Sequence, residues 1–119
     1  MQGLSHYEKE MRPWGTFERF TLNEPCTVKI ITVNPNEEFS LQRHEHRDEV
    51  WRILKGSGRA IIGDTVLNAL PGEDFFVVRG VTHRVSAGPE GLTFLELAFG
   101  DFDENDIKRF EDKYGRAIN

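Results

Sequence analysis

The sequence predicts an all-β fold, a small antiparallel barrel or sandwich, and three observations support it. Short segments rich in β-branched and aromatic residues recur along the chain. Residues that favour turns separate these segments at close intervals, which is typical of antiparallel β-structures and not of alternating βαβ units. The length of 119 residues allows one hydrophobic core, so we expect a single domain over residues 1–119.

The expected strands follow one another from the amino terminus. Residues 1–12 are polar and fit either a frayed arm or an edge strand. Further strands are expected at residues 16–22, 27–33 (TVKIITV), 50–54, 59–62, 74–78 and 92–99 (LTFLELAF). The glycine-containing runs 55–58 and 63–64 are expected to be turns, and the first of them would close a hairpin. Four aromatic residues are expected in the core: Trp14, Trp51, Phe75 and Phe76.

The carboxy-terminal tail has a different pattern. Apolar side chains recur there at helical spacing: Ile107, Phe110 and Tyr114. Asp103 is placed to cap the start of a helix, and Gly115 lies where a helix would end. We therefore expect one short C-terminal helix that packs its apolar stripe on the barrel.

The segment QRHEHRDE, residues 42–49, holds the densest group of metal-binding residue types. Imidazole together with carboxylate suits Zn, Mn, Fe, Co or Ni, so the segment predicts a divalent metal site without identifying the metal. Successive strand residues point to opposite faces, so Gln42 and His44 share one face. Glu49 lies beyond a short turn, at the start of the next strand, and His83 follows downstream.

The spacing of these residues resembles the two signatures of cupins. Gln42, His44 and Glu49, followed by a glycine at position 56, match the first, and the run from Gly72 to His83 matches the second, with valine in place of its proline. The resemblance implies a double-stranded β-helix, which is a jelly-roll-like antiparallel barrel, with Gln42, His44, Glu49 and His83 as ligands. In a rival register His44 and His46 form the histidine pair. In the preferred one His46 is a spare ligand or a catalytic group.

Further motifs make the chain similar to type II mannose-6-phosphate isomerases. They are the run RPWG at residues 12–15, residues 40–51, His83-Arg84, and the tail motif DIKRFEDKYGR at residues 106–116. The resemblance implies a metal-dependent aldose–ketose isomerase that interconverts mannose 6-phosphate and fructose 6-phosphate through an enediol. Related enzymes often carry a guanylyltransferase domain as well, for which these residues leave no room, so we do not expect that activity here. The run Glu96-Leu97-Ala98 departs from the family pattern, which leaves the exact hexose phosphate open.

An isomerase of this kind needs a base and a cation that binds phosphate. Glu96 interrupts an apolar strand and could enter the interior, where burial would raise its pKa, or it could face outward. His46 is the other candidate base. Arg84 beside His83, Lys29 in mid-strand and Arg109 in the tail are candidate substrate-binding residues, and Arg84 is also a candidate catalytic residue. Each of these cations could instead make a structural or surface ion pair.

Composition limits the other classes of function. The formal net charge of −5 argues against a nucleic-acid partner. The single cysteine, Cys26, permits no intramolecular disulfide and favours a reducing compartment. No signal-peptide pattern or apolar run of transmembrane length occurs. We expect a cytoplasmic protein without a membrane partner that acts on a sugar phosphate, and the cupin resemblance implies a homodimer. The alternatives are a cupin dioxygenase and a non-catalytic sugar-binding cupin.

Overall fold

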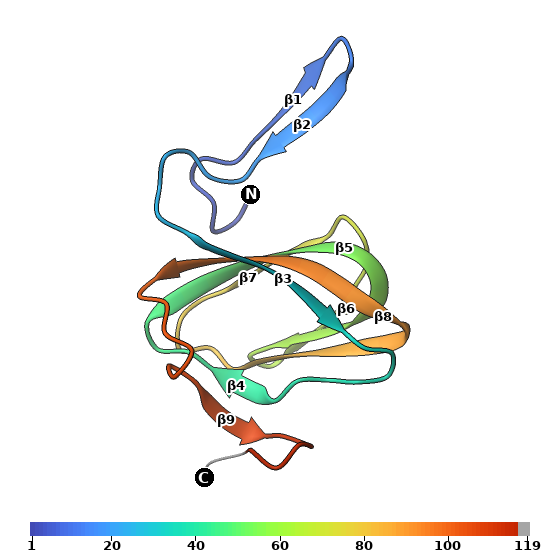
Figure 1. Ribbon diagram of the computed structural model, residues 1–119, viewed down its shortest axis with the longest axis vertical. Coiled ribbons are helices and arrows are strands. Elements are labelled where there is room, and N and C mark those ends of the chain that lie inside the picture. The colour runs from blue at the N-terminus through green and yellow to red at the C-terminus, as the bar shows by residue number, and fades with distance from the viewer. Residues whose placement is uncertain (117–119) are drawn as a thin grey trace.

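Two long strands, β5 (Arg47–Ile62) and β8 (His83–Gly100), run antiparallel to each other and form the frame of the fold (Figure 1). The structure, a computed structural model, describes residues 1–116, and within that range it contains strands and no helix. The other strands are β1 (Glu8–Arg12), β2 (Gly15–Arg19), β3 (Thr27–Val33), β4 (Leu41–Arg43), β6 (Thr65–Ala69), β7 (Asp74–Val77) and β9 (Lys108–Glu111).

Each of the two long strands pairs with one neighbour near its start and with another near its end. The first half of β5 pairs with β7 and its second half with β6, while β8 pairs with β4 at one end and with β3 at the other. The sheet therefore folds over on itself, and its inner faces enclose the core. Large apolar side chains fill that core, among them Trp51, Ile53, Val85, Leu92 and Phe94. Burying these side chains is the main force that holds the barrel closed.

The hairpin turn expected at residues 55–58 is wrong, because β5 continues through this segment as one bent strand. Its pairing with β8 shifts register between Ile53 and Lys55 and again between Gly56 and Gly58. Gly56 has a φ of +87°, and a Cβ atom at this position would lie 2.1 Å from the carbonyl oxygen of Gly91. The glycines thus mark a bend where two backbones approach closely. The turn expected at residues 63–64 is confirmed.

The expected C-terminal helix is also wrong. Residues Lys108–Glu111 form strand β9, which pairs with β4 so that Arg109 lies opposite Gln42 and Lys108 opposite Arg43. A short apolar stripe is a poor basis for an isolated helix, whereas the free edge of β4 offers backbone partners. Asp103, expected to cap the helix, instead accepts a bond from the backbone N–H of Asp106 at 3.0 Å in a turn.

The amino-terminal strands β1 and β2 form a separate two-stranded sheet that stands away from the barrel (Figure 1). Of the two structures considered for residues 1–12, the strand is the one that forms, over Glu8–Arg12. Trp14 lies between the strands and is 74% exposed, so the expectation that it packs in the core is wrong, while Trp51 and Phe75 are core residues. Across residues 1–116, no helix suited to crossing a bilayer is found.

Candidate metal centre

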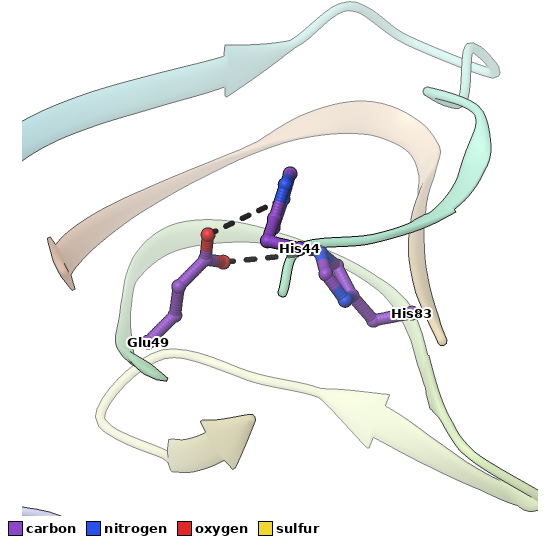
Figure 2. Close-up of side chains that lie close together, drawn as sticks. All are labelled: His44, Glu49 and His83. Atoms are coloured by element: carbon purple, nitrogen blue, oxygen red, sulfur yellow. Dashed lines mark ion pairs between the residues drawn. The ribbon is translucent and has the colours of Figure 1, made fainter. Parts of the chain in front are cut away.

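Three strands bring His44, Glu49 and His83 together, as Figure 2 shows. His44 directly follows β4, Glu49 lies in β5, and His83 begins β8. The carboxylate of Glu49 faces both rings, with its Oε2 atom 3.4 Å from Nε2 of His44 and its Oε1 atom 3.9 Å from Nε2 of His83. One donor atom from each residue falls within 4.8 Å of the others, and all three side chains are buried. This grouping can hold a metal ion.

The hydrogen bonds of the two imidazoles orient their Nε2 atoms toward Glu49. Nδ1 of His44 lies 2.6 Å from the carbonyl oxygen of Asp106, and Nδ1 of His83 lies 3.1 Å from that of Val81. A carbonyl only accepts, so each Nδ1 carries the hydrogen and each Nε2 keeps its lone pair. Burial lowers the pKa of both histidines, which favours the neutral form that binds metals. The donor set therefore fits a divalent cation.

Gln42 lies beside this group. It is opposite His83 in the pairing of β4 with β8 and lines the same cavity as the three buried residues. Its Oε1 atom accepts a hydrogen bond from the hydroxyl of Ser40 at 3.3 Å. Gln42 is thus placed near the candidate ligands, and its own role as a ligand stays a prediction.

The cavity in front of the three residues has a volume of about 230 Å³ and also contains Glu96. Glu96 lies on the inner face of β8, between the buried residues Phe94 and Ala98, so the interior placement is the one that forms. Burial and the neighbouring Glu49 carboxylate raise the pKa of Glu96 to about 8. For Glu49, burial is outweighed by a hydrogen bond from Glu96 and by nearby positive charge, so its pKa is lowered. Glu96 therefore holds the proton that the two carboxyls share.

Lys29 and Arg109 reach the cavity, and their partners differ. The ammonium of Lys29 is 2.7 Å from the carboxylate of Glu104. Within residues 1–116, Arg109 makes no ion pair, and its buried Nε–H has no hydrogen-bond partner. An unpaired buried donor is costly unless a ligand satisfies it. Arg109 is therefore a cation of this cavity with a donor left unpaired among the described residues.

Two candidate residues lie outside the cavity. His46 is exposed in the turn after β4, where its backbone N–H donates to the Asp106 carboxylate at 2.9 Å. Arg84 lies on the opposite face of β8 from His83 and donates to the carbonyl oxygens of Phe39 and Glu111, each at 3.0 Å. Its contacts hold the tail, and neither His46 nor Arg84 lines this cavity, so their catalytic and substrate-binding roles stay predictions.

Two residues that sequence reasoning did not select contribute to the centre. Arg47 is 6% exposed and lines the cavity, with its Nε donating to Oε2 of Glu49 at 3.0 Å. It lies two residues before Glu49 on the same strand face, so the alternation of the strand was the signal that could have found it. Asp106 accepts from the backbone N–H groups of Glu45 and His46 through its carboxylate, and its carbonyl orients His44. Its position in the tail motif was the available signal.

The chain was compared with known proteins. The family described as "Mannose-6-phosphate isomerase C-terminal" matches residues 2–112. "Xanthan biosynthesis protein XanB" of Xanthomonas campestris pv. campestris (strain B100) is 38% identical over 113 residues, which cover 93% of this chain and 24% of that protein. "Mannose-1-phosphate guanylyltransferase ManC" of Salmonella typhimurium is 37% identical over 115 residues, which cover 94% of this chain and 24% of that protein. The chain thus spans about a quarter of the length of these curated relatives.

Solved structures confirm the expected fold. A conserved protein with a double-stranded β-helix domain from Klebsiella pneumoniae is similar to this chain with a TM-score of 0.63 and 19% identity. The match covers 74% of this chain and 76% of that one. Over residues 1–116 the fold is the cupin double-stranded β-helix, without the expected C-terminal helix.

Proposed function

We propose, since this chain belongs to the mannose-6-phosphate isomerase C-terminal family, that it is a metal-dependent sugar-phosphate isomerase with mannose 6-phosphate and fructose 6-phosphate as its substrate pair. The observation that carries the proposal is the cavity itself. A buried group of two imidazoles and a carboxylate lies there beside a second carboxyl that retains its proton at neutral pH. Such a site combines a place for a cation with a group that can move a proton.

His44, Glu49 and His83 would hold the metal, with Gln42 beside them as the proposed fourth ligand. The donor set suits Zn, Mn, Co, Ni or Fe. When bound, such an ion supplies Lewis-acid polarisation of a carbonyl oxygen and stabilises an adjacent negative charge. The carbonyl groups of Asp106 and Val81 keep the two imidazoles turned toward Glu49, so the donor atoms need little rearrangement.

Glu96 is the proposed acid–base group. Interconversion of an aldose and a ketose moves a proton between C1 and C2 of the open-chain sugar, so one group must remove it and return it. A carboxyl with a pKa of about 8 can both lose and regain a proton near neutral pH. General acid–base catalysis of this kind contributes about 10²- to 10⁴-fold to the rate. The surrounding buried apolar residues, Phe94 and Ala98, keep bulk water from the carboxyl.

Arg109 and Lys29 are the proposed phosphate-binding residues. The guanidinium of Arg109 can donate two parallel hydrogen bonds to a phosphate, and its buried Nε–H has no protein partner among the described residues. Lys29 would exchange its ion pair with Glu104 for the substrate. Both cations lie at the cavity that holds Glu96, so one sugar phosphate could contact all three residues.

Metal analysis combined with an isomerase assay tests the proposal. The protein is expected to convert mannose 6-phosphate to fructose 6-phosphate, to lose this activity with a chelator and to regain it with added divalent metal. His83→Ala should lose both metal and activity while keeping the β-rich circular dichroism spectrum. His6→Ala is the matched control, because His6 is exposed and distant in sequence from the proposed ligands. Full metal content in His83→Ala would refute the ligand set.

The assay also separates the other functions considered. Thermal stabilisation by a sugar phosphate without any product would indicate a non-catalytic sugar-binding cupin. Oxygen consumption by the iron-loaded protein would indicate a dioxygenase. A cytoplasmic location and assembly as a homodimer stay predictions.

A further inference from the structure

Arg47 occupies an unusual place for an arginine, inside the barrel and against the proposed metal ligands. Its Nε donates to Oε2 of Glu49 at 3.0 Å, and its Nη2 lies 3.1 Å from Nε2 of His44. The guanidinium also contacts Asp103 and Phe102. Nη1 donates to the carbonyl oxygen of Asp103 at 3.2 Å, and the planar group lies 4.3 Å from the ring centre of Phe102.

The contact with His44 excludes a metal bond at the same atom. Nδ1 of His44 bonds to the carbonyl of Asp106, so Nε2 carries the only free lone pair of the ring. Arginine stays protonated in proteins and is a donor only, so its Nη2 must use that lone pair. A cation at His44 therefore has to displace the guanidinium from Nε2, and a cation bound through Oε2 of Glu49 has to displace it there as well.

The same contacts balance the buried charge of the site. Glu49 is 2% exposed, and a buried carboxylate is costly without a positive partner. Arg47 supplies that charge and bridges His44 and Glu49, which come from opposite sides of a turn. The contacts with Asp103 and Phe102 use no proposed ligand atom, so they can keep the guanidinium beside the cavity after it leaves the ligands.

We propose that Arg47 is a built-in counter-cation, which holds the ligand atoms of His44 and Glu49 in the metal-free protein and which a metal ion must displace. The inference rests on the ligand set of the proposed function. Once displaced from the ligand atoms, the guanidinium is a cation that lines the same cavity, where an anionic substrate would bind.

Metal affinity measures the competition directly. Arg47→Met keeps much of the apolar stem and removes the charge and the donors. Titration of the metal-free protein with Zn²⁺, buffered by a competing chelator, should give binding about 10- to 100-fold tighter in this variant than in the wild type, the range expected for lost charge-assisted hydrogen bonds. The metal-free variant should also melt at a lower temperature, because Glu49 is left without its partner.

Arg59→Met is the matched control. Arg59 is an exposed residue of the same strand, and within residues 1–116 its side chain makes no ion pair or hydrogen bond. The Arg59→Met substitution removes the same charge without changing any contact of the proposed ligands. The Zn²⁺ affinity of this variant should therefore differ from that of the wild type by less than about twofold. If Arg59→Met tightens binding as much as Arg47→Met, the effect is long-range attraction and the inference fails.

A second measurement uses the wild-type protein and does not depend on the folding of a variant. In the metal-free protein the Nε–H of Arg47 should give a protected nitrogen–proton resonance, because it is buried and hydrogen-bonded. Saturation with Zn²⁺ should shift this resonance and speed its exchange with water. A resonance that is unchanged at full Zn²⁺ occupancy would overturn the inference.

The outcomes distinguish this inference from the proposed function. If the wild type binds Zn²⁺ and Arg47→Met binds it no tighter, the displacement of Arg47 is refuted while the metal site stands. If neither protein binds Zn²⁺, the ligand set of the proposed function is refuted, and the inference is refuted with it.

Discussion

Glu49 and Glu96 share one buried cavity, yet their surroundings give them different charges. Glu49 accepts hydrogen bonds from Glu96 and from the Arg47 guanidinium, which favour its ionised form. Glu96 has apolar neighbours and the negative charge of Glu49 beside it, which favour its protonated form. Two titratable groups with pKa values pushed apart are typical of sites in which one group holds a charge and the other moves a proton.

Replacing Glu96 tests this difference through stability. Its folded-state pKa is raised from 4.5 to about 8, so the folded state binds a proton that the unfolded state releases. Stability should therefore fall as the pH rises from 4.5 toward 8. Glu96→Gln keeps a donor toward Glu49 and cannot ionise, so it should stabilise the metal-free protein at pH 7 by on the order of 1–3 kcal/mol, measured by chemical denaturation.

The same variant should lose isomerase activity by about 10²- to 10⁴-fold, because the proton can no longer be transferred. Glu90→Gln, at an exposed position, should change neither quantity. Equal loss of stability with pH in wild type and Glu96→Gln would show that Glu96 does not hold a proton in the folded state.

The candidate metal ligands could be predicted from the sequence more readily than the residue that contacts them, Arg47. His44, Glu49 and His83 could be selected because imidazole and carboxylate at fixed spacing have a recognisable chemistry. Arg47 could not be selected in the same way, because a charged residue is expected at the surface unless its partner is known. Its burial depends on Glu49, and the one sequence signal for that pairing was the alternation of β5, which places both residues on one face.

Among the elements, β5 depends on a glycine bend where it meets β8. Gly56 has a φ of +87°, and an added Cβ would approach the Gly91 carbonyl oxygen to 2.1 Å. Gly72 has a similar φ of +88°, but nothing lies within 4 Å of a Cβ there. The two positions therefore share the cost of a left-handed backbone and differ in the close contact.

Alanine substitutions at these two positions should separate the two costs. Gly72→Ala should destabilise the protein by about 1–2 kcal/mol, the cost of the left-handed conformation alone. Gly56→Ala should cost about 1–3 kcal/mol more, because β5 and β8 must move apart. Chemical denaturation of both variants measures the difference. Equal losses would mean that the bend tolerates the added atom.

An ion pair between Glu18 and Arg52 joins the hairpin formed by β1 and β2 to the barrel. Glu18 of β2 accepts two hydrogen bonds from Arg52 of β5, at 2.9 and 3.0 Å, and one from the hydroxyl of Tyr7. The bonds from Arg52, and then that from Tyr7, lower the pKa of Glu18 from 4.5 to about 2. A lowered folded-state pKa means that this attachment is complete above pH 4.5 and is lost as the pH falls toward 2.

Hydrogen exchange can follow this attachment separately from the barrel. Between pH 4.5 and pH 2, amides of β1 and β2 should lose protection before those of β5 and β8. Glu18→Gln should weaken their protection at neutral pH and remove most of its dependence on acid. Glu73→Gln, at an exposed position, serves as the control. Loss of protection at one common pH for hairpin and barrel would contradict a separate attachment through Glu18.

The strands of the barrel could be predicted because β-branched runs such as β3 form where turn residues bound them. The structure of the tail could not be predicted in this way, because its apolar residues have helical spacing and do not alternate as in a strand. Ile107 and Phe110 have helical spacing, yet the tail finds a free strand edge on β4 and becomes β9. The partner that decided between the two structures lies about 65 residues earlier in the chain, and local patterns carry no information about it.

At the scale of the whole molecule, the proposed ligands connect parts of the barrel that are distant in sequence. His44 follows β4, Glu49 lies on the inner face of β5, and His83 starts β8. In the pairing of β5 with β8, His83 lies opposite Ile62. Because both strands bend, the imidazole of His83 also lies near the carboxylate of Glu49. A metal ion held by these residues would therefore cross-link the barrel, and it could bind only where the barrel is folded.

Metal binding should accordingly stabilise the folded protein as a whole. A ligand that binds only the folded state at 100 times its dissociation constant adds about 2.7 kcal/mol to the free energy of unfolding. For a chain of this size that corresponds to a rise in Tm of roughly 10 °C, measured calorimetrically after stripping the protein and adding Zn²⁺. A chelator should reverse the rise, His83→Ala should show none, and His6→Ala should behave as the wild type. A Tm that rises equally in His83→Ala would place the bound ion elsewhere, because a barrel cross-linked through His83 cannot gain stability from the metal once that imidazole is gone.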